Sequence, residues 1–355
     1  MKYQVPRYLG IQDVQRTKKN SYVLNVGFSD HLSKKVQVDS EAMEVLKFFL
    51  QAKTANAAKK NFSWSDAKTQ EVLEGLKTAK LLVEVPKRPK KYERYDRHSL
   101  FYQLGDLNGL EAQKILSQKK VALIGAGGIG NWVGLNLIGA GFKEIRIIDF
   151  DRVELTNLTR QVLFDEKDLG KLKTEVAAKA LQKKNTQTKV RPVEMKVTSA
   201  KELKKVLKGM DFVILSADRP EKIHDWVDEA CQALQIPYLN IGYRDGEGVV
   251  GPMTVPGKTS CYQCFKSQTS EDKTKDHSSA EIQNLFDDRY QAPSFGPLNA
   301  LVSTVGSLEV IKYFTGLGEL RSLDTEISVN ALTLEWRHHS YHRDAHCWHC
   351  QSDSL

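Results

Sequence analysis

The chain has 355 residues, of which 41% are hydrophobic and 27% are charged, as in ordinary globular proteins. No apolar run approaches the ~20 residues that span a bilayer, and the N-terminal residues lack the apolar core of a secretory signal. We therefore expect a cytoplasmic protein without a membrane partner. The net charge of +8 fits a lysine-coated surface or an anionic partner such as a nucleotide, while the absence of nucleic-acid-binding motifs makes nucleic acid an unexpected partner.

Residues 1–88 predict a small separate domain. Residues 22–26 and 36–38 have the composition of short strands, and Asp39 or Ser40 is placed to cap a helix whose apolar residues recur at helical spacing. A second helix is predicted from about Ser63 and leads into a strand at residues 81–85. Strands followed by two helices and a strand resemble a winged-helix-like fold, which leaves a DNA-binding function open.

A basic, proline-containing segment at residues 86–94 predicts a domain boundary, so that residues 89–355 form a second, α/β domain. Helices and strands alternate along this domain, as in a doubly wound sheet. Residues 267–283 are polar and without period, which predicts a loop. Strands are predicted near residues 121–124, 145–148, 190–197, 212–216, 238–242 and 248–255, and helices at 109–117, 132–138, 173–184, 200–208, 226–235 and 300–314.

The most informative stretch is the glycine cluster after the first of these strands. Glycines allow a backbone to approach phosphate oxygens, and the N-terminus of the following helix offers unpaired N–H donors. Asp149 follows about 20 residues later, where a ribose-binding acid is expected in a βαβ nucleotide site. On these features alone a dinucleotide-dependent dehydrogenase remains possible. The glycines of the cluster are Gly125, Gly127, Gly128 and Gly130.

Three further residues favour a nucleoside triphosphate over a dinucleotide. Asn157, Arg160 and Lys173 supply a neutral donor, a forked cation and a point cation, a set that suits charge growing during attack at phosphorus. Asp218 follows a buried strand and offers an oxygen ligand for Mg²⁺.

Each of these residues also has a purely structural alternative. Asp149 could cap a turn, Lys173 could be a solvated helix lysine, and Asp218 could begin a helix. Arg160 could pair with Asp165 or Glu166, and Arg97 with Asp96 or Asp106.

Four of the five cysteines form two CxxC pairs, and two such pairs complete a tetrahedral Zn²⁺ site with no position left for water. We therefore predict a structural zinc site that ties the C-terminal tail to the main domain. His346 and His349 flank the second pair and are predicted to be surface histidines, as are His338, His339 and His342. The predicted zinc ligands are Cys261, Cys264, Cys347 and Cys350.

Taken in order, these motifs resemble the superfamily of ubiquitin-activating enzymes, which includes the ThiF and MoeB adenylating enzymes of thiamin and molybdopterin synthesis. The resemblance covers about residues 94–350. Residues 156–164, 170–176 and 255–264, together with the N-terminal module, most resemble the MccB-type enzymes of microcin C biosynthesis. The motifs are Arg94-Tyr-x-Arg97, the glycine cluster, Asp149-x-Asp151, Thr156-Asn-Leu-x-Arg-Gln161, Gly170-x-x-Lys173, Ser216-Ala-Asp218 and the two CxxC pairs.

This resemblance implies a Rossmann-like, ThiF-type adenylation domain preceded by a winged-helix-like peptide clamp, or RiPP recognition domain. It places Asp149, within the Asp149-x-Asp151 motif, on the ribose, and Mg²⁺ on Asp218. It implies a homodimer in which Arg97 reaches the partner's site as an arginine finger. The residues that it places on the phosphates are Asn157, Arg160 and Lys173.

The same resemblance implies a short ribosomal precursor peptide ending in asparagine as the substrate, in microcin C-like antibiotic biosynthesis. The peptide's carboxylate would attack the α-phosphate of ATP or CTP, the asparagine would close to a succinimide, and its nitrogen would take a second nucleotide in a P–N bond. Cys231, the one cysteine outside the zinc set, is predicted to be a buried core residue, so we expect no thioester step.

Two other functions stay open at this point. One is adenylation of the C-terminus of a ubiquitin-like sulfur-carrier protein, and the other is peptide binding without catalysis. The N-terminal module favours the peptide nucleotidyltransferase over the sulfur-carrier enzymes, which usually begin close to Arg-Tyr-x-Arg. The full set of Asp149, Arg160, Lys173 and Asp218 argues against loss of catalysis.

Overall fold

The computed structural model describes residues 1–17, 21–27, 33–87, 89–269, 293–347 and 349–350. These residues divide into two compact units, Met1–Ala112 and Gln113–Leu355. The first unit therefore continues past residue 88, where the sequence places the domain boundary, and includes the segment up to Ala112. Helix α5 (Gly109–Leu116) contains the division.

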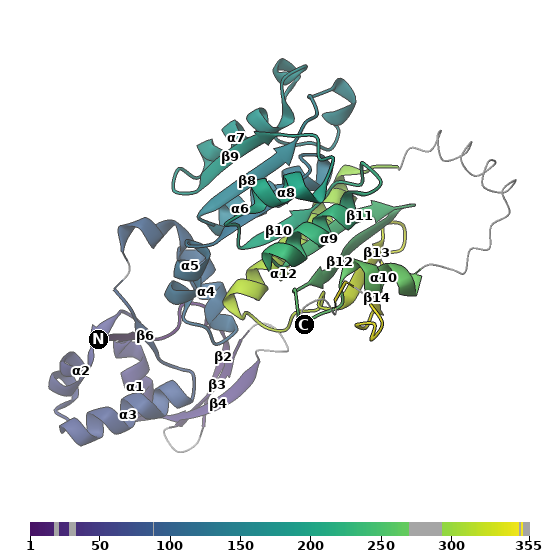
Figure 1. The fold of residues 1–355 in the computed structure, drawn as a ribbon. Coiled ribbons are helices and arrows are strands. Elements are labelled where there is room, and N and C mark those ends of the chain that lie inside the picture. The colour runs from purple at the N-terminus through teal and green to yellow at the C-terminus, as the bar shows by residue number, and fades with distance from the viewer. Residues whose placement is uncertain (18–20, 28–32, 88, 270–292, 348, 351–355) are drawn as a thin grey trace, which may run out of the picture. The chain divides into compact units, whose positions relative to one another are not determined.

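The first unit combines two small antiparallel sheets with helices (Figure 1). One sheet has the order β2-β3-β4 and the other β5-β1-β6. The strands are β1 (Lys2–Gln4), β2 (Ile11–Arg16), β3 (Ser21–Val26), β4 (Lys34–Asp39), β5 (Lys53–Thr54) and β6 (Val83–Val85). The helices are α1 (Ser40–Phe48), α2 (Ala55–Phe62), α3 (Asp66–Thr78), the 3-10 helix η1 (Lys90–Tyr95) and α4 (Asp96–Leu104).

Side-chain caps fix where the helices of this unit begin. Asp39 accepts a hydrogen bond from the backbone N–H of Ala42 and starts α1, as predicted, while Ser65 caps α3. The faces of α1 and α3 that point inward carry Val45, Leu46 and Leu73, which pack with strand residues into one apolar core.

The second unit is built on one eight-stranded sheet with the order β14-β13-β12-β11-β10-β7-β8-β9. Strands β9, β8, β7, β10 and β11 are parallel to one another. Strands β12, β13 and β14 continue the sheet in antiparallel orientation. The strands are β7 (Lys120–Ile124), β8 (Glu144–Asp149), β9 (Lys189–Glu194), β10 (Phe212–Leu215), β11 (Tyr238–Arg244), β12 (Glu247–Thr254), β13 (Thr325–Asn330) and β14 (Trp336–Ser340).

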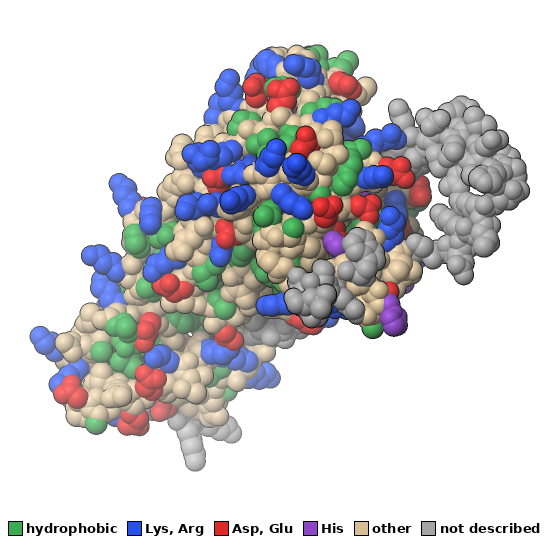
Figure 2. Space-filling view, viewed as in Figure 1, with side chains coloured by type: hydrophobic (Ala, Val, Ile, Leu, Met, Phe, Trp, Pro, Cys, Tyr) green, Lys and Arg blue, Asp and Glu red, His purple; other side chains and the backbone are tan. Residues whose placement is uncertain are grey.

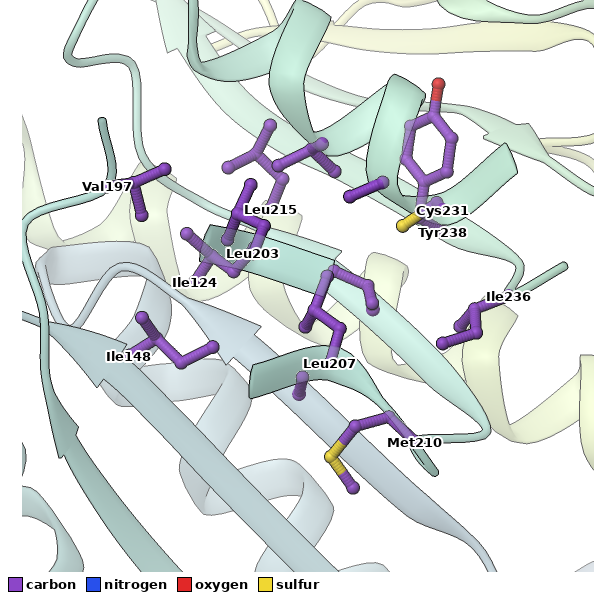
Figure 3. Close-up of a cluster of buried hydrophobic side chains, with 14 of the residues drawn as sticks. Ile124, Ile148, Val197, Leu203, Leu207, Met210, Leu215, Cys231, Ile236 and Tyr238 are labelled. Atoms are coloured by element: carbon purple, nitrogen blue, oxygen red, sulfur yellow. The ribbon is translucent and has the colours of Figure 1, made fainter. Parts of the chain in front are cut away.

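Helices pack on both faces of this sheet, as in a doubly wound fold. Helices α8 and α9 cover one face through the apolar cluster drawn in Figure 3, whereas α6 and α12 pack together and α12 lies against β11 and β12. The helices are α6 (Gly128–Ala140), α7 (Lys173–Lys184), α8 (Ala200–Leu207), α9 (Ile223–Leu234), α10 (Tyr262–Thr269) and α12 (Gly296–Thr315), with short 3-10 helices η2 (Leu155–Asn157) and η3 (Glu166–Asp168).

The predicted loop at residues 267–283 is wrong at its start, because residues 267–269 belong to α10. The rest of that prediction, from residue 270 on, lies outside the described residues. Among the helices that the structure describes, none combines the length and the hydropathy of a membrane span. On the face drawn in Figure 2, Lys and Arg side chains are distributed among acidic ones, which fits the lysine-coated surface considered above.

Candidate active site

Strand order places a crevice between β7 and β10. The chain runs from β7 outward to β8 and β9 on one side, and to β10 and β11 on the other. The loops that leave β7 and β10 therefore diverge at the carboxyl ends of neighbouring parallel strands, which is where ligands bind in open α/β sheets. The glycine cluster follows β7, and Ser216–Asp218 follows β10. The Ser216 hydroxyl donates to the backbone oxygen of Gly125 across 3.1 Å and joins the two loops.

The glycine cluster is shaped by contacts that exclude side chains. Gly125 has φ +100°, and a Cβ there would lie 3.0 Å from Ser216. A Cβ on Gly128 would lie 2.2 Å from Asn299 Nδ2, and one on Gly130 would lie 2.1 Å from the oxygen of Gly125. Gly127 differs, because a Cβ there would meet nothing within 4 Å. Its backbone therefore faces open space that a ligand can approach closely.

Helix α6 begins directly behind this loop with Gly127 as its N-cap and has no side-chain cap. The first N–H groups of a helix lack intrahelical partners, and the helix dipole adds positive potential at that end. The loop and the start of α6 thus form a cradle of the kind that binds phosphate.

Two carboxylates and one lysine lie beside the cradle. Asp149 accepts hydrogen bonds from the backbone N–H of Ala126 at 2.6 Å and of Asp151 at 2.8 Å, so it also holds the glycine loop in place. Lys173 is only 7% exposed, and its Nζ donates to Asp151 Oδ2 across 2.9 Å. The alternative of a solvated helix lysine is therefore wrong for Lys173.

Two cavities meet at the cradle and share Gly127, Ser216, Ala217 and Asp218. The first, of about 320 Å³, is also lined by Gly125, Asp149, Phe150, Asp151, Lys173, Val197 and Ile223. The second, of about 390 Å³, is also lined by Gly128, Arg160, Gln161, His224, Asn240, Tyr243, Arg244, Tyr262 and Glu326.

Arg160 lines the second cavity, whereas Asn157 lines neither. The Arg160 guanidinium donates to the backbone oxygen of Thr156 across 2.8 Å, and among the described residues it forms no ion pair with Asp165 or Glu166. Asn157 is buried, and its Oδ1 accepts from the backbone N–H of Glu154, so its present partners are those of a turn cap.

Asp218 is exposed on the loop after β10 and lines both cavities. The alternative that Asp218 begins a helix is wrong, because α9 begins only at Ile223, with Lys222 as its N-cap. Within the part of the chain that the structure describes, no hydrogen bond or ion pair engages the Asp218 carboxylate. Its oxygens are therefore available to a cation.

Arg97 lies in the first unit, with an exposed side chain on α4. Its proposed structural partners are occupied: Asp96 pairs with Arg7 at 2.7 Å, and Asp106 pairs with Lys80 at 2.6 Å. Among the described residues, neither acid forms an ion pair with Arg97.

The four cysteines of the CxxC pairs come together and are all buried. The sulfur atom of Cys261 lies 3.8 Å from that of Cys264 and 3.6 Å from that of Cys347. The sulfur atom of Cys264 lies 3.5 Å from that of Cys350. Four thiolates at about 2.3 Å from a tetrahedral Zn²⁺ would be about 3.8 Å apart, so this arrangement fits the predicted metal. The backbone N–H of Asp344 also points at the sulfur of Cys264, across 3.4 Å.

His346 is exposed as predicted, but the prediction of a surface position is wrong for His349. Its Nδ1 lies 3.0 Å from Oδ2 of Asp228, whose side chain is fully buried on α9. The adjacent Asp228 carboxylate raises the pKa of His349. Asp228 also accepts from the Tyr238 hydroxyl at 2.9 Å, so this carboxylate links the tail to both α9 and β11.

Cys231 is fully buried on α9 within the cluster of Figure 3, as the helical period predicts. Burial raises the pKa of its thiol well above the usual value, and Asp228 adds to that effect. A neutral thiol without solvent access is a poor nucleophile.

Sequence reasoning missed His224, Asn240, Arg244 and Glu326, which line the second cavity. A signal was present for two of them. His224 opens the helix that follows Asp218, and Asn240 is a polar residue within the otherwise apolar run of β11. Glu326 on β13 gave no signal, because its partner Arg244 is far away in the chain.

Five parallel strands with a phosphate cradle at the point where strand order reverses are typical of α/β nucleotide-binding proteins. The ThiF family profile matches residues 95–349, so the chain belongs to the ThiF family. It is 27% identical to the sulfur carrier protein ThiS adenylyltransferase of Escherichia coli K12 over 263 residues, which are 73% of this chain and 95% of that protein. These relationships identify the chain as a nucleotidyltransferase and set the dehydrogenase interpretation aside.

Solved structures extend the similarity to the whole chain. A crystal structure of E. coli MccB with MccA-N7isoASN is 30% identical, has a TM-score of 0.79, and is matched over 99% of both chains. A structure of E. coli MccB with ATP is 29% identical, with a TM-score of 0.76, and is matched over 99% of this chain and 100% of that one. The structure of PaaA, at 20% identity and a TM-score of 0.70, shows the same fold.

Proposed function

We propose that this enzyme transfers a nucleoside monophosphate from ATP or CTP to the C-terminal asparagine of a short ribosomal peptide, in microcin C-like antibiotic biosynthesis. The observation that supports it most is the match to MccB along both whole chains, because it includes residues 1–94, which the ThiF profile leaves out. MccB has been crystallised with both its peptide MccA and a nucleotide.

The nucleotide is proposed to occupy the first cavity. Asp149, with Asp151 beside it, would bind the ribose hydroxyls, and the glycine cradle would hold the phosphates. Lys173 would exchange Asp151 for a phosphate oxygen, a short move for a flexible ammonium group. Arg160 would approach from the second cavity and Asn157 from its turn, while Asp218 at the shared wall would hold Mg²⁺.

The peptide's C-terminus is proposed to enter the second cavity. An oxygen of its carboxylate attacks the α-phosphorus, and pyrophosphate leaves. The side-chain amide nitrogen then attacks the activated carbonyl carbon, which expels the nucleoside monophosphate and a proton and forms a succinimide. That nitrogen attacks a second nucleotide, and a P–N bond forms as pyrophosphate and a proton leave. Water then opens the succinimide ring, so that the product is the starting peptide plus one nucleotidyl group. Attack at phosphorus depends on positioning and charge neutralisation, which the cations of this site would supply.

Parts outside the cavities complete the proposal. Residues 1–88 would clamp the peptide, and Arg97 would reach the active site of a partner subunit in a homodimer. Cys261, Cys264, Cys347 and Cys350 would hold a structural Zn²⁺, whose only contribution is to fix the C-terminal tail against the sheet domain.

Adenylation of a ubiquitin-like sulfur carrier is the second candidate, and it rests on the similarity to the ThiS adenylyltransferase. That activity gives no role to the unit Met1–Ala112, which precedes most of the ThiF match.

One experiment separates these functions. Short peptides ending in asparagine, including any that is encoded beside the gene, are synthesised and incubated with the enzyme, Mg²⁺ and either ATP or CTP. A mass gain of one nucleoside monophosphate is expected for the peptide and none for a ThiS protein. No gain on any peptide ending in asparagine would refute the proposal. A shift of unrelated DNA duplexes at physiological salt would instead support the DNA-binding alternative.

A further inference from the structure

The second cavity contains two buried polar atoms that lack hydrogen-bond partners among the described residues: Nδ1 of His224 and Oδ1 of Asn240. His224 comes from the first turn of α9, and Asn240 from β11. Asn240 is close enough to raise the pKa of His224, yet the pair does not meet hydrogen-bond geometry. A buried polar atom left unpaired costs about 1–3 kcal/mol, so two in one cavity point to a ligand that satisfies both.

Burial favours the uncharged form of the His224 imidazole, and the Asn240 amide carries no charge. Burial lowers the pKa of His224, and the neighbouring acids Asp225 and Asp218 offset this only in part. The Asp225 carboxylate is itself engaged by Gln263 at 2.7 Å. The His224 ring stacks on Tyr262 with centroids 5.3 Å apart, which fixes the plane of the imidazole. A neutral imidazole can donate from one nitrogen, and an amide oxygen accepts.

One donor beside one acceptor, both uncharged, is the complement of a primary carboxamide. We propose that His224 and Asn240 form the subsite that recognises the side-chain amide of the substrate's C-terminal asparagine. Asn240 Oδ1 accepts from the amide NH₂, and His224 Nδ1–H donates to the amide oxygen. This inference rests on the proposed function, and nothing in the sequence motifs or the comparisons assigns these two residues a role.

The subsite lies where such recognition is useful. Its cavity shares Gly127 and the loop Ser216–Asp218 with the nucleotide cavity, so an amide held there leaves the adjoining α-carboxylate near the transfer point. An aspartate side chain in the same place would set a carboxylate oxygen against Asn240 Oδ1, with no proton to share. A site built to pair a polar group rejects an analogue that cannot pair by a large factor, on the order of 10² or more.

The test compares two synthetic peptides that differ only in a C-terminal Asn or Asp, with kcat/KM for nucleotide incorporation as the readout. Wild-type enzyme is expected to favour Asn by at least about 100-fold. Asn240→Leu removes the acceptor, and His224→Phe removes the donor but keeps the stack on Tyr262. Each should bring the ratio within about 10-fold of unity, mainly through loss on the Asn peptide, while His338→Phe on exposed β14 should leave it unchanged.

Asn240→Asp keeps an acceptor of the same shape and should retain the preference for Asn over Asp. Nucleotide binding in the absence of peptide shows whether each variant is folded, because the first cavity, where the nucleotide is proposed to bind, is not lined by His224 or Asn240. Wild-type preference retained in both Asn240→Leu and His224→Phe would overturn the subsite. A wild-type enzyme that modifies neither peptide would refute the proposed function itself. That outcome is read from the wild type, whereas failure of the subsite is read from the two variants.

Discussion

Lys173 donates from its Nζ to Asp151 Oδ2 across 2.9 Å. Lys173 is the first residue of α7, and its side chain is almost fully buried. A buried ammonium requires a partner, and here that partner lies on the wall of the first cavity, in which we propose that the nucleotide binds. The pairing holds the cation ready at the position where a phosphate would compete with Asp151 for it.

The first prediction follows from this pair. Lys173→Ala should reduce kcat/KM for nucleotide transfer about 10²–10³-fold, as expected when one preorganised donor to a developing charge is lost. Lys171→Ala is the matched control, because Lys171 is half-exposed and pairs with Asp168 away from the cavities. Transfer assays with both variants check this. Equal activity of the two would show that Lys173 does not contact the phosphates.

Glu309 on α12 gives a prediction for stability against pH. Its side chain is buried and accepts from the backbone N–H of Arg321 and Ser322, at 2.8 and 2.9 Å, and from Lys312 at 2.9 Å. Burial alone would raise its pKa, but Lys312 and Ser322 outweigh burial and lower it. Glu309→Gln should therefore reduce the free energy of unfolding by about 1–3 kcal/mol at neutral pH.

The sign of the pH dependence follows from the lowered pKa. The folded protein prefers the ionised carboxylate, so this stabilisation is complete above the ordinary glutamate pKa of about 4.3 and is lost as the pH falls below it. The difference in free energy of unfolding between the wild type and Glu309→Gln, measured by urea titration, should therefore narrow as the pH falls below that pKa. Glu319 forms an exposed ion pair with Arg321 and serves as the control. The free energy of unfolding of Glu319→Gln should stay within about 0.5 kcal/mol of that of the wild type at every pH.

Much of the sheet domain could be predicted from local patterns. Helix α7 runs from Lys173 to Lys184 as predicted, because its apolar period and its first-turn and last-turn charges agree. Strand β14 was missed because all five of its residues are exposed, so it shows no alternation. Helix α4 was missed because it follows η1 without a side-chain cap.

The candidate site was predictable only where one motif is contiguous in sequence. The glycine loop, Asp149 and Lys173 meet around one cavity, as their βαβ spacing requires. Asn157, assigned to the phosphates by resemblance, lies outside both cavities and caps its own turn. His224 and Asn240 belong to different elements, and only the packing of α9 against the sheet brings them together.

The cysteines give a prediction with a built-in contrast. Cys347→Ser should lose zinc and lower the melting temperature by on the order of 10 °C, because the proposed metal would join the tail to Cys264 on α10. Cys231→Ala should keep zinc and transfer activity and cost about 1–2 kcal/mol of stability through a small cavity. Metal analysis and thermal unfolding measure both. A covalent peptide adduct on Cys231 in intact-mass spectra would contradict the absence of a thioester step.

Arg97 carries the prediction on assembly. Arg97→Ala should abolish transfer while leaving the fold and the dimer intact, because its exposed guanidinium is proposed to act at the phosphates of another subunit. Lys91→Ala, on the preceding η1, is a control for the loss of one exposed positive charge. Light scattering gives the oligomeric state, and full activity of Arg97→Ala would show that the finger assignment is wrong.

Mixing two inactive variants tests whether Arg97 acts between subunits. In a heterodimer of Arg97→Ala with Lys173→Ala, one active site combines a native Lys173 with a native Arg97 from the opposite subunit, and the other site lacks both. Random reassortment makes half of the dimers mixed, so about a quarter of wild-type activity should return in a two-fold symmetric assembly. If Arg97 instead serves its own subunit, every site in the mixture lacks one of the two cations, and activity stays at the level of the separate variants.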